Sequence, residues 1–266
     1  MSVPMAARTG IPPLENGDRL SRDEFHRRYE AMPEDVRAEL IEGVVYMAAE
    51  LPANFCYPPR TGIPVLENGD HLSREEFERR YEAMPESVHA ELIEGVVYMA
   101  SPVRLNAHGE PQGTLIGWLA IYASTRPGVR HGDNTTLLLD AGNEPQPDGL
   151  LRYDDGQSTL SEEGYIVGAP ELVVEVSSST VSYDLNVKME MYRRNGVREY
   201  VAWRVLDDEL DWFILRNGVY ERLVADDGGI VSSEVFPGLR LNVPALLGGD
   251  IARVLREQFE ANNVES

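Results

Sequence analysis

Hydrophobic and polar residues after position 100 alternate between helical and strand-like spacing. Apolar residues recur every three or four positions in 108–123, in 183–195 and from 251 onward, which predicts three amphipathic helices. Runs of β-branched and other apolar residues, and the Asn217-Gly218 turn signal, predict strands. The expected strands are 134–140, 147–153, 171–177, 198–204, 210–215 and 219–224. This order predicts an α/β fold with a mixed sheet, helices on its faces and additional β-hairpins.

The front of the chain repeats itself. Residues 9–48 recur as 61–100 at an offset of 52, and six of the 40 positions differ. In the second copy, Ser73 and Glu76 form a capping box, apolar residues continue at helical spacing to Pro85, and 92–99 reads as a hairpin. Two copies are too few for a solenoid, which stacks several units. The pattern therefore predicts a duplicated N-terminal helix–hairpin unit.

The repeat also suggests a domain boundary. Only the second copy continues directly into the remaining chain, whereas residues 49–60 (AELPANFCYPPR) resemble a linker. We therefore expect residues 61–266 to form the complete domain. Residues 1–60 would be a duplicated unit and linker, whose apolar residues could pack on a second copy of the chain in a homodimer.

Composition narrows the environment of the protein. The 266 residues include 42% hydrophobic ones, enough for a buried core, and a formal net charge of −21 opposes a nucleic-acid backbone overall. No apolar run is long enough for a membrane span, and the first residues carry no secretory signal, so a cytoplasmic location is expected. The single cysteine, Cys56, reads as an incidental thiol.

Three polar residues could form one site. Glu175 lies inside the apolar run LVVEV, where an unpaired carboxylate would cost several kcal/mol, so a cation must approach it. Lys188, the only lysine beside 23 arginines, lies on the apolar stripe of the next helix and is expected to face the sheet. Asp148 begins the preceding strand. An alternative is that Lys188 only pairs with Asp184 on a solvated helix.

Two carboxylates and a lysine suit metal-dependent phosphodiester hydrolysis. Carboxylate oxygens hold Mg²⁺ or Mn²⁺, the metal acidifies a water, and lysine stabilises charge on the attacked phosphate. Compared with the planar guanidinium of arginine, the compact ammonium of Lys188 is the better group for orienting a water or donating a proton.

Over about residues 70–205 the sequence resembles the PD-(D/E)XK nuclease superfamily, and within it the Uma-two family of restriction endonucleases. The resemblance rests on ELIEGVVYMASP, a following His108, QPD and APELVVEVSSSTVSYDLNVKMEMYRRNGVREYV. It implies a restriction endonuclease-like fold, a Mg²⁺ or Mn²⁺ cofactor and DNA as the substrate.

The resemblance also assigns roles. It implies that Asp148 and Glu175 are catalytic metal ligands and that Lys188 is the catalytic lysine. The superfamily places its lysine two positions after the acid, where this chain has Ser177, whereas the Uma-two pattern places it in the following helix. Glu91, in the early ELIEG element, is either a further catalytic metal ligand or an exposed hairpin residue.

Other residues near these motifs are read as structural. A lone His108 without a second ligand at metal spacing favours a structural role, and Glu171 is expected at a solvated strand end. Residues 132–175 carry a net charge of −9, while 102–131 and 188–204 carry +2 and +3. This distribution predicts a cation site bordered by weakly basic segments.

The leading hypothesis is therefore a metal-dependent DNA endonuclease. The alternative is a nuclease-fold module that binds nucleic acid or protein without catalysis, with the repeated unit as its interaction surface. No zinc finger or helix-turn-helix is present, so the sequence predicts neither a target site nor a preference between DNA and RNA.

Overall fold

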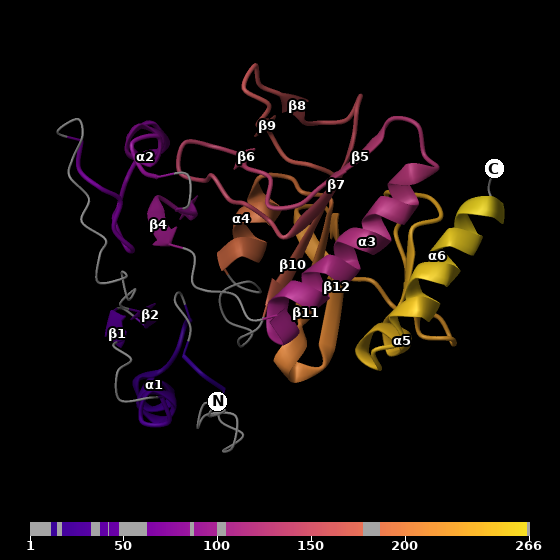
Figure 1. Cartoon of the computed structure of the whole chain (residues 1–266), viewed down its shortest axis with the longest axis horizontal. Coiled ribbons are helices and arrows are strands. Elements are labelled where there is room, and N and C mark those ends of the chain that lie inside the picture. The colour runs from indigo at the N-terminus through magenta and orange to yellow at the C-terminus, as the bar shows by residue number, and fades with distance from the viewer. Residues whose placement is uncertain are drawn as a thin grey trace.

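The structure is a computed structural model of the chain (Figure 1). It describes residues 12–14, 18–32, 38–41, 43–47, 63–85, 88–99, 105–177 and 187–264. Cys56, Asp184 and the whole of the expected linker at 49–60 lie outside these ranges.

A six-stranded mixed sheet forms the centre of the fold (Figure 1). β10 and β11 run parallel at its middle, and the other neighbouring strands are antiparallel. In spatial order the strands are β13 (Val219–Arg222), β12 (Glu209–Arg216), β11 (Glu199–Arg204), β10 (Leu172–Ser177), β7 (Gly149–Tyr153) and β5 (Val129–Gly132).

Helices cover both faces of this sheet. Helices α3 (Glu110–Ser124) and α6 (Ile251–Val264) pack on one face, where Trp118 meets Trp212 edge to face at 5.6 Å. Helix α4 (Met189–Arg194) lies on the other face. Because side chains alternate along a strand, Val174 of β10 faces α3 and its neighbour Glu175 faces α4.

Shorter elements complete the main body. A π-helix (Leu105–Gly109) leads into α3, and a 3₁₀ turn (Val205–Asp207) follows β11. A small sheet joins β6 (Leu137–Leu138), β9 (Ile166–Val167) and β8 (Thr159–Leu160). Near the C-terminus, β14 (Ile230–Ser232) pairs with β15 (Arg240–Asn242), which leads into α5 (Val243–Leu247).

Both copies of the repeat form a helix followed by a hairpin. The first contains α1 (Arg22–Tyr29), β1 (Ala38–Ile41) and β2 (Val44–Met47). The second contains α2 (Arg74–Tyr81), β3 (Ala90–Ile93) and β4 (Val96–Met99). Each copy has a small apolar cluster of its own, built around Phe25 in the first and Phe77 in the second.

The local signals of the second copy act nearly as expected. The Ser73 hydroxyl accepts a hydrogen bond from the Glu76 N–H at 3.4 Å, so it caps α2. The Glu76 carboxylate, however, binds Arg79 and Arg80, because full guanidinium charges lie within one turn. Only half of the predicted capping box therefore forms.

The expected strand 134–140 is the main local error. Only Leu137–Leu138 pairs there, because Asn134 takes a left-handed backbone conformation (φ 45°) and Asp140 begins a turn. Strand β5 was not predicted, because its central residues, Arg130 and His131, are polar and exposed and give no apolar alternation. The Asn217-Gly218 turn forms as predicted, with positive φ at both residues.

Candidate functional site

The Glu175 carboxylate meets Lys188 inside the fold. The Lys188 ammonium lies 3.2 Å from both carboxylate oxygens, and the two side chains are 8% and 4% exposed. Strand β10 supplies the acid, and Lys188 directly precedes α4 on the same side of the sheet. The lysine thus faces the sheet as its position on the apolar stripe predicts.

Tyr192 makes a second contact with the same carboxylate. It lies one helical turn after Lys188, and its hydroxyl donates to Glu175 Oε1 at 2.8 Å. Complete burial, strengthened by the negative charge of Glu175, holds the pKa of Tyr192 well above its usual range, so the phenol stays a donor. The apolar stripe predicted a core residue here and gave no sign of the hydrogen bond.

Glu91 approaches Lys188 from the hairpin of the second copy. Its carboxylate lies 3.2 Å from the ammonium and also accepts a hydrogen bond from the Gln146 N–H at 2.7 Å. The Glu91 side chain is 22% exposed, so it is not the free hairpin glutamate of the alternative interpretation. Lys188 therefore bridges two carboxylates from separate parts of the chain.

Asp148 lies at the start of β7 and is held by three neighbours. One carboxylate oxygen accepts from the Val176 N–H at 2.7 Å, and the other lies 3.3 Å from His108 Nε2. The Gln112 side-chain amide donates to the Asp148 carbonyl at 3.3 Å. The sequence favoured a structural role for His108, but the structure places it against the predicted metal ligand.

The strand pairing places the two predicted metal ligands at neighbouring strands. Val174 of β10 pairs with Gly149 of β7, so Glu175 and Asp148 each lie one residue beyond the last pair of this antiparallel ladder. The Asp148 carboxylate accepts from the Val176 N–H, so it lies beside the residue that follows Glu175. This strand pairing brings the segments of Asp148 and Glu175, which are 27 positions apart in the chain, next to each other.

Asp148 and Glu175 are chemically suited to a small divalent cation. Both offer hard oxygen donors, and Mg²⁺ is commonly held by one or two carboxylates together with waters and substrate phosphates. Among the described residues, no three Asp, Glu, His or Cys side chains gather into a metal-binding group. The donor set therefore fits a two-carboxylate site that substrate would complete, rather than a closed protein cage.

Glu171 is not at a solvated strand end, as the sequence suggested. It is 2% exposed, and its carboxylate accepts from the Tyr153 N–H at 3.0 Å and the Gln157 N–H at 3.1 Å. The register that makes β7 and β10 adjacent also buries this residue. Glu171 ties the end of β7 to the turn that follows it.

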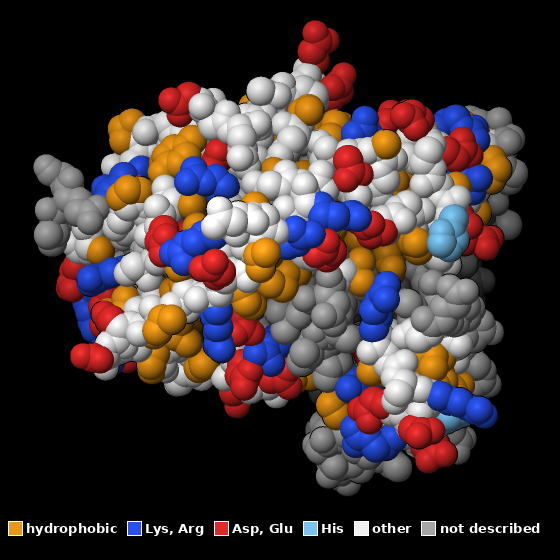
Figure 2. All heavy atoms as spheres, turned by 180° about the vertical axis from the view of Figure 1, so that it is seen from behind, with side chains coloured by type: hydrophobic (Ala, Val, Ile, Leu, Met, Phe, Trp, Pro, Cys, Tyr) orange, Lys and Arg blue, Asp and Glu red, His pale blue; other side chains and the backbone are white. Residues whose placement is uncertain are grey.

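The arginines beside the site are matched by carboxylates. Arg193 pairs with Glu190, Arg194 with Glu94, and Arg204 with three acidic residues. On the face shown in Figure 2, blue and red side chains are interspersed over the described surface. The basic segment expected at 188–204 is thus largely neutralised by local carboxylates.

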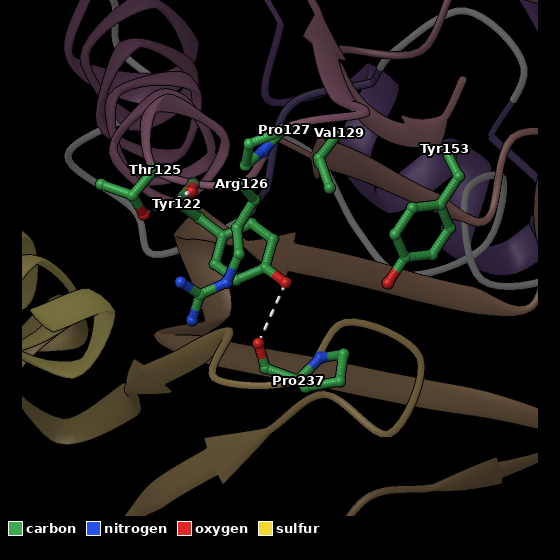
Figure 3. A pocket seen from close by; sticks show the side chains of 7 residues that line it. All are labelled: Tyr122, Thr125, Arg126, Pro127, Val129, Tyr153 and Pro237. Carbon is green, nitrogen blue, oxygen red and sulfur yellow. Dashed lines mark hydrogen bonds between the residues drawn. The ribbon is translucent and has the colours of Figure 1, made fainter. Parts of the chain in front are cut away.

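A hollow of about 470 Å³ lies at the opposite end of β7 (Figure 3). Tyr122, Arg126 and Tyr153 line it, and the Tyr122 hydroxyl donates to the Pro237 carbonyl at 3.0 Å. Asp148 is five residues from Tyr153, about 17 Å along an extended strand. This hollow is therefore separate from the carboxylate–lysine site, which is a compact polar cluster.

A mixed sheet flanked by helices, with an acid on its central parallel pair, has the architecture of the restriction endonuclease-like nucleases. The model of the Uma2 family, described as "Putative restriction endonuclease", matches residues 74–244. The chain belongs to this family.

A solved structure supports the fold independently. A crystal structure described as a "putative nuclease belonging to DUF820" from Anabaena variabilis aligns with a TM-score of 0.52 and 15% identity. The alignment covers 64% of this chain and 96% of that one. No curated protein matches the sequence, and none of the described helices has the length and apolarity that a membrane crossing needs.

Proposed function

We propose that the protein is a metal-dependent endonuclease that hydrolyses phosphodiester bonds in DNA. The observation that carries the proposal is the buried cluster in which Lys188 contacts Glu175, on the strand that pairs with the one directly after Asp148. Membership of a family described as restriction endonucleases supports this reaction class and a nucleic-acid substrate.

Asp148 and Glu175 are the residues that would hold Mg²⁺ or Mn²⁺. The bound cation would supply an acidified water and neutralise charge on the phosphate. Val176 and His108 orient the Asp148 carboxylate through its two oxygens. Tyr192 fixes one oxygen of Glu175 beside Lys188 through its hydrogen bond.

Lys188 has the electrostatic role in this proposal. Its ammonium is a compact donor with little exposure to water, so its charge acts strongly on a neighbouring phosphate oxygen. Glu91 belongs to the same group as a partner that holds the ammonium from the hairpin side. A phosphate entering the cluster would pair with the Lys188 ammonium in place of one of the two glutamates.

The test is cleavage of supercoiled plasmid and single-stranded DNA in Mg²⁺ or Mn²⁺. We expect cleavage by the wild type, and a loss of about 100-fold or more in Asp148→Asn, Glu175→Gln and Lys188→Ala. Arg193→Ala is the matched control, because Arg193 lies on the same helix but pairs with Glu190 at the surface. Equal cleavage by the wild type and Lys188→Ala would remove the lysine from the mechanism.

A second candidate function is that of a nuclease-fold module that binds nucleic acid or protein without cutting. It is favoured by the ion pairs that already occupy Lys188. Binding of DNA with no cleavage in either metal, over both substrates, would support this second function and contradict the first.

A further inference from the structure

The hairpin of the second copy is fastened to one segment of the main body, residues 140–146, which we call the receiving segment. Leu92 and Glu144 exchange both backbone hydrogen bonds, at 3.2 and 2.7 Å. The Gly95 N–H donates to the Gly142 carbonyl at 2.7 Å, and the Arg74 N–H donates to the Ala141 carbonyl at 3.0 Å. The unit thus docks by strand-edge pairing, which depends on backbone geometry.

Side chains complete the attachment. The Glu94 N–H donates to Asn143 Oδ1 at 2.7 Å, and Glu91 accepts from the Gln146 N–H. Ile93 is fully buried in the core cluster on the α4 face of the central sheet. This docking places the Glu91 carboxylate beside the Lys188 ammonium.

The first copy has the same residue at every one of these docking positions. Arg22, Glu39, Leu40, Glu42 and Gly43 stand 52 positions before their counterparts, and none of the six differences between the copies falls there. In the described part of the chain, β1 pairs only with β2. The first copy therefore offers the same docking edge without an assigned strand beside it.

We propose that the two copies are interchangeable occupants of the one receiving segment, so that β1 of the same chain docks there when β3 leaves. The pairing would join Leu40 to Glu144 and bring Glu39 to the position that Glu91 now has beside Lys188. Both copies belong to one chain, so the exchange is intramolecular and has the high effective concentration of a tethered partner.

One difference between the copies affects how strongly each would dock on the receiving segment. Glu144 is 5% exposed and faces Glu78 and Arg74 of α2; burial, strengthened by the Glu78 charge, raises the pKa of Glu144 to about 8. The first copy has His26 in place of Glu78. Its docking would replace a carboxyl–carboxyl contact with a carboxyl–imidazole contact, which offsets part of the advantage of the directly connected second copy.

Disulfide trapping tests this exchange without reference to nuclease activity. In a full-length chain carrying Cys56→Ser, Leu92→Cys with Glu144→Cys should form an intrachain disulfide, since directly paired strand residues have suitable spacing. Leu40→Cys with Glu144→Cys should form one only when the first copy docks. Arg27→Cys with Glu144→Cys is the control for random collision, because Arg27 is an exposed residue of the same unit and its counterpart Arg79 pairs with Glu76 and not with the receiving segment.

We expect the Leu40 pair to cross-link within the chain at least about fivefold faster than the Arg27 control at equal oxidant. A rate equal to that control, with the Leu92 pair forming normally, would overturn the proposal. Cross-linking of the Leu40 pair only between chains would also overturn it, since the docking would then not be intramolecular. If the Leu92 pair formed no disulfide in a folded protein, the docking on which the proposal rests would be contradicted.

A second pair of positions avoids the apolar clusters. Glu94 pairs with Arg194 at the surface, so Glu94→Cys with Arg194→Cys should react with a short bismaleimide. Glu42→Cys with Arg194→Cys reports docking of the first copy at the same point. Cross-linking of this pair above an Arg27→Cys and Arg194→Cys control supports exchange, and cross-linking at the control level contradicts it.

Discussion

Replacing Lys188 with methionine isolates the energetics of the buried cluster. The substitution keeps a long side chain but removes the ammonium that contacts Glu175 and Glu91. With the Lys188 and Glu175 side chains 8% and 4% exposed, loss of the cation leaves a buried carboxylate without its counter-charge. Removing one partner of such a buried pair costs about 3–5 kcal/mol.

We therefore expect Lys188→Met to lower the free energy of unfolding by about 3 kcal/mol at pH 7.5, nearer the lower limit because Glu91 is partly solvated. In a domain of this size that corresponds to a fall in Tm of about 6–12 °C. The loss should shrink at pH 5, since protonation of a buried, unpaired carboxyl group removes its charge.

Thermal and urea unfolding measure both effects, and Lys188→Met with Glu175→Gln should recover most of the stability. Arg193→Met is the matched control: its partner Glu190 is 52% exposed, so its ion pair contributes below about 1 kcal/mol. A Lys188→Met loss no larger than that of Arg193→Met, or a double variant less stable than the single one, would refute the reasoning.

Three further perturbations have defined outcomes. Tyr192→Phe removes the hydrogen bond to Glu175 and should lower unfolding free energy by about 1–3 kcal/mol by urea titration, with reduced cleavage. Glu144→Gln should stabilise the protein above pH 8: the folded-state pKa of Glu144, about 8, exceeds the unfolded value, so wild-type stability falls as pH rises from about 4.5 to 8. The gain, on the order of a few kcal/mol, should vanish below pH 4.5 in unfolding titrations. Glu171→Gln should cost about 1–3 kcal/mol in the same assay, because its carboxylate accepts two backbone hydrogen bonds.

The sequence predicted those parts of the fold whose signals are local. The spacing of apolar residues located β10, β11 and α3, because their side chains are largely buried. The Asn217-Gly218 turn was located because it requires positive φ at both residues. Edge strand β5 was missed because few of its residues are buried. A helical stripe likewise placed Lys188 toward the sheet, since the face of a helix depends only on spacing along it.

What the sequence missed in the site depends on contacts between distant segments. His108 reaches Asp148 from the start of α3, and Glu91 reaches Lys188 only because the hairpin docks on residues 140–146. The positions of these residues along the chain do not indicate that they come into contact. The burial of Glu171 has the same origin, since the turn after β7 folds over it.

Cleavage of supercoiled plasmid as a function of Mg²⁺ concentration, in the wild type and in Asp148→Asn, tests the central claim most directly. Asparagine can still accept the Val176 N–H hydrogen bond, so the variant should remain folded while losing a charged metal ligand. The account predicts saturable, Mg²⁺-dependent cleavage by the wild type and a background rate for the variant at every concentration. Equal rates for both proteins, or wild-type cleavage that persists in excess chelator, would contradict it.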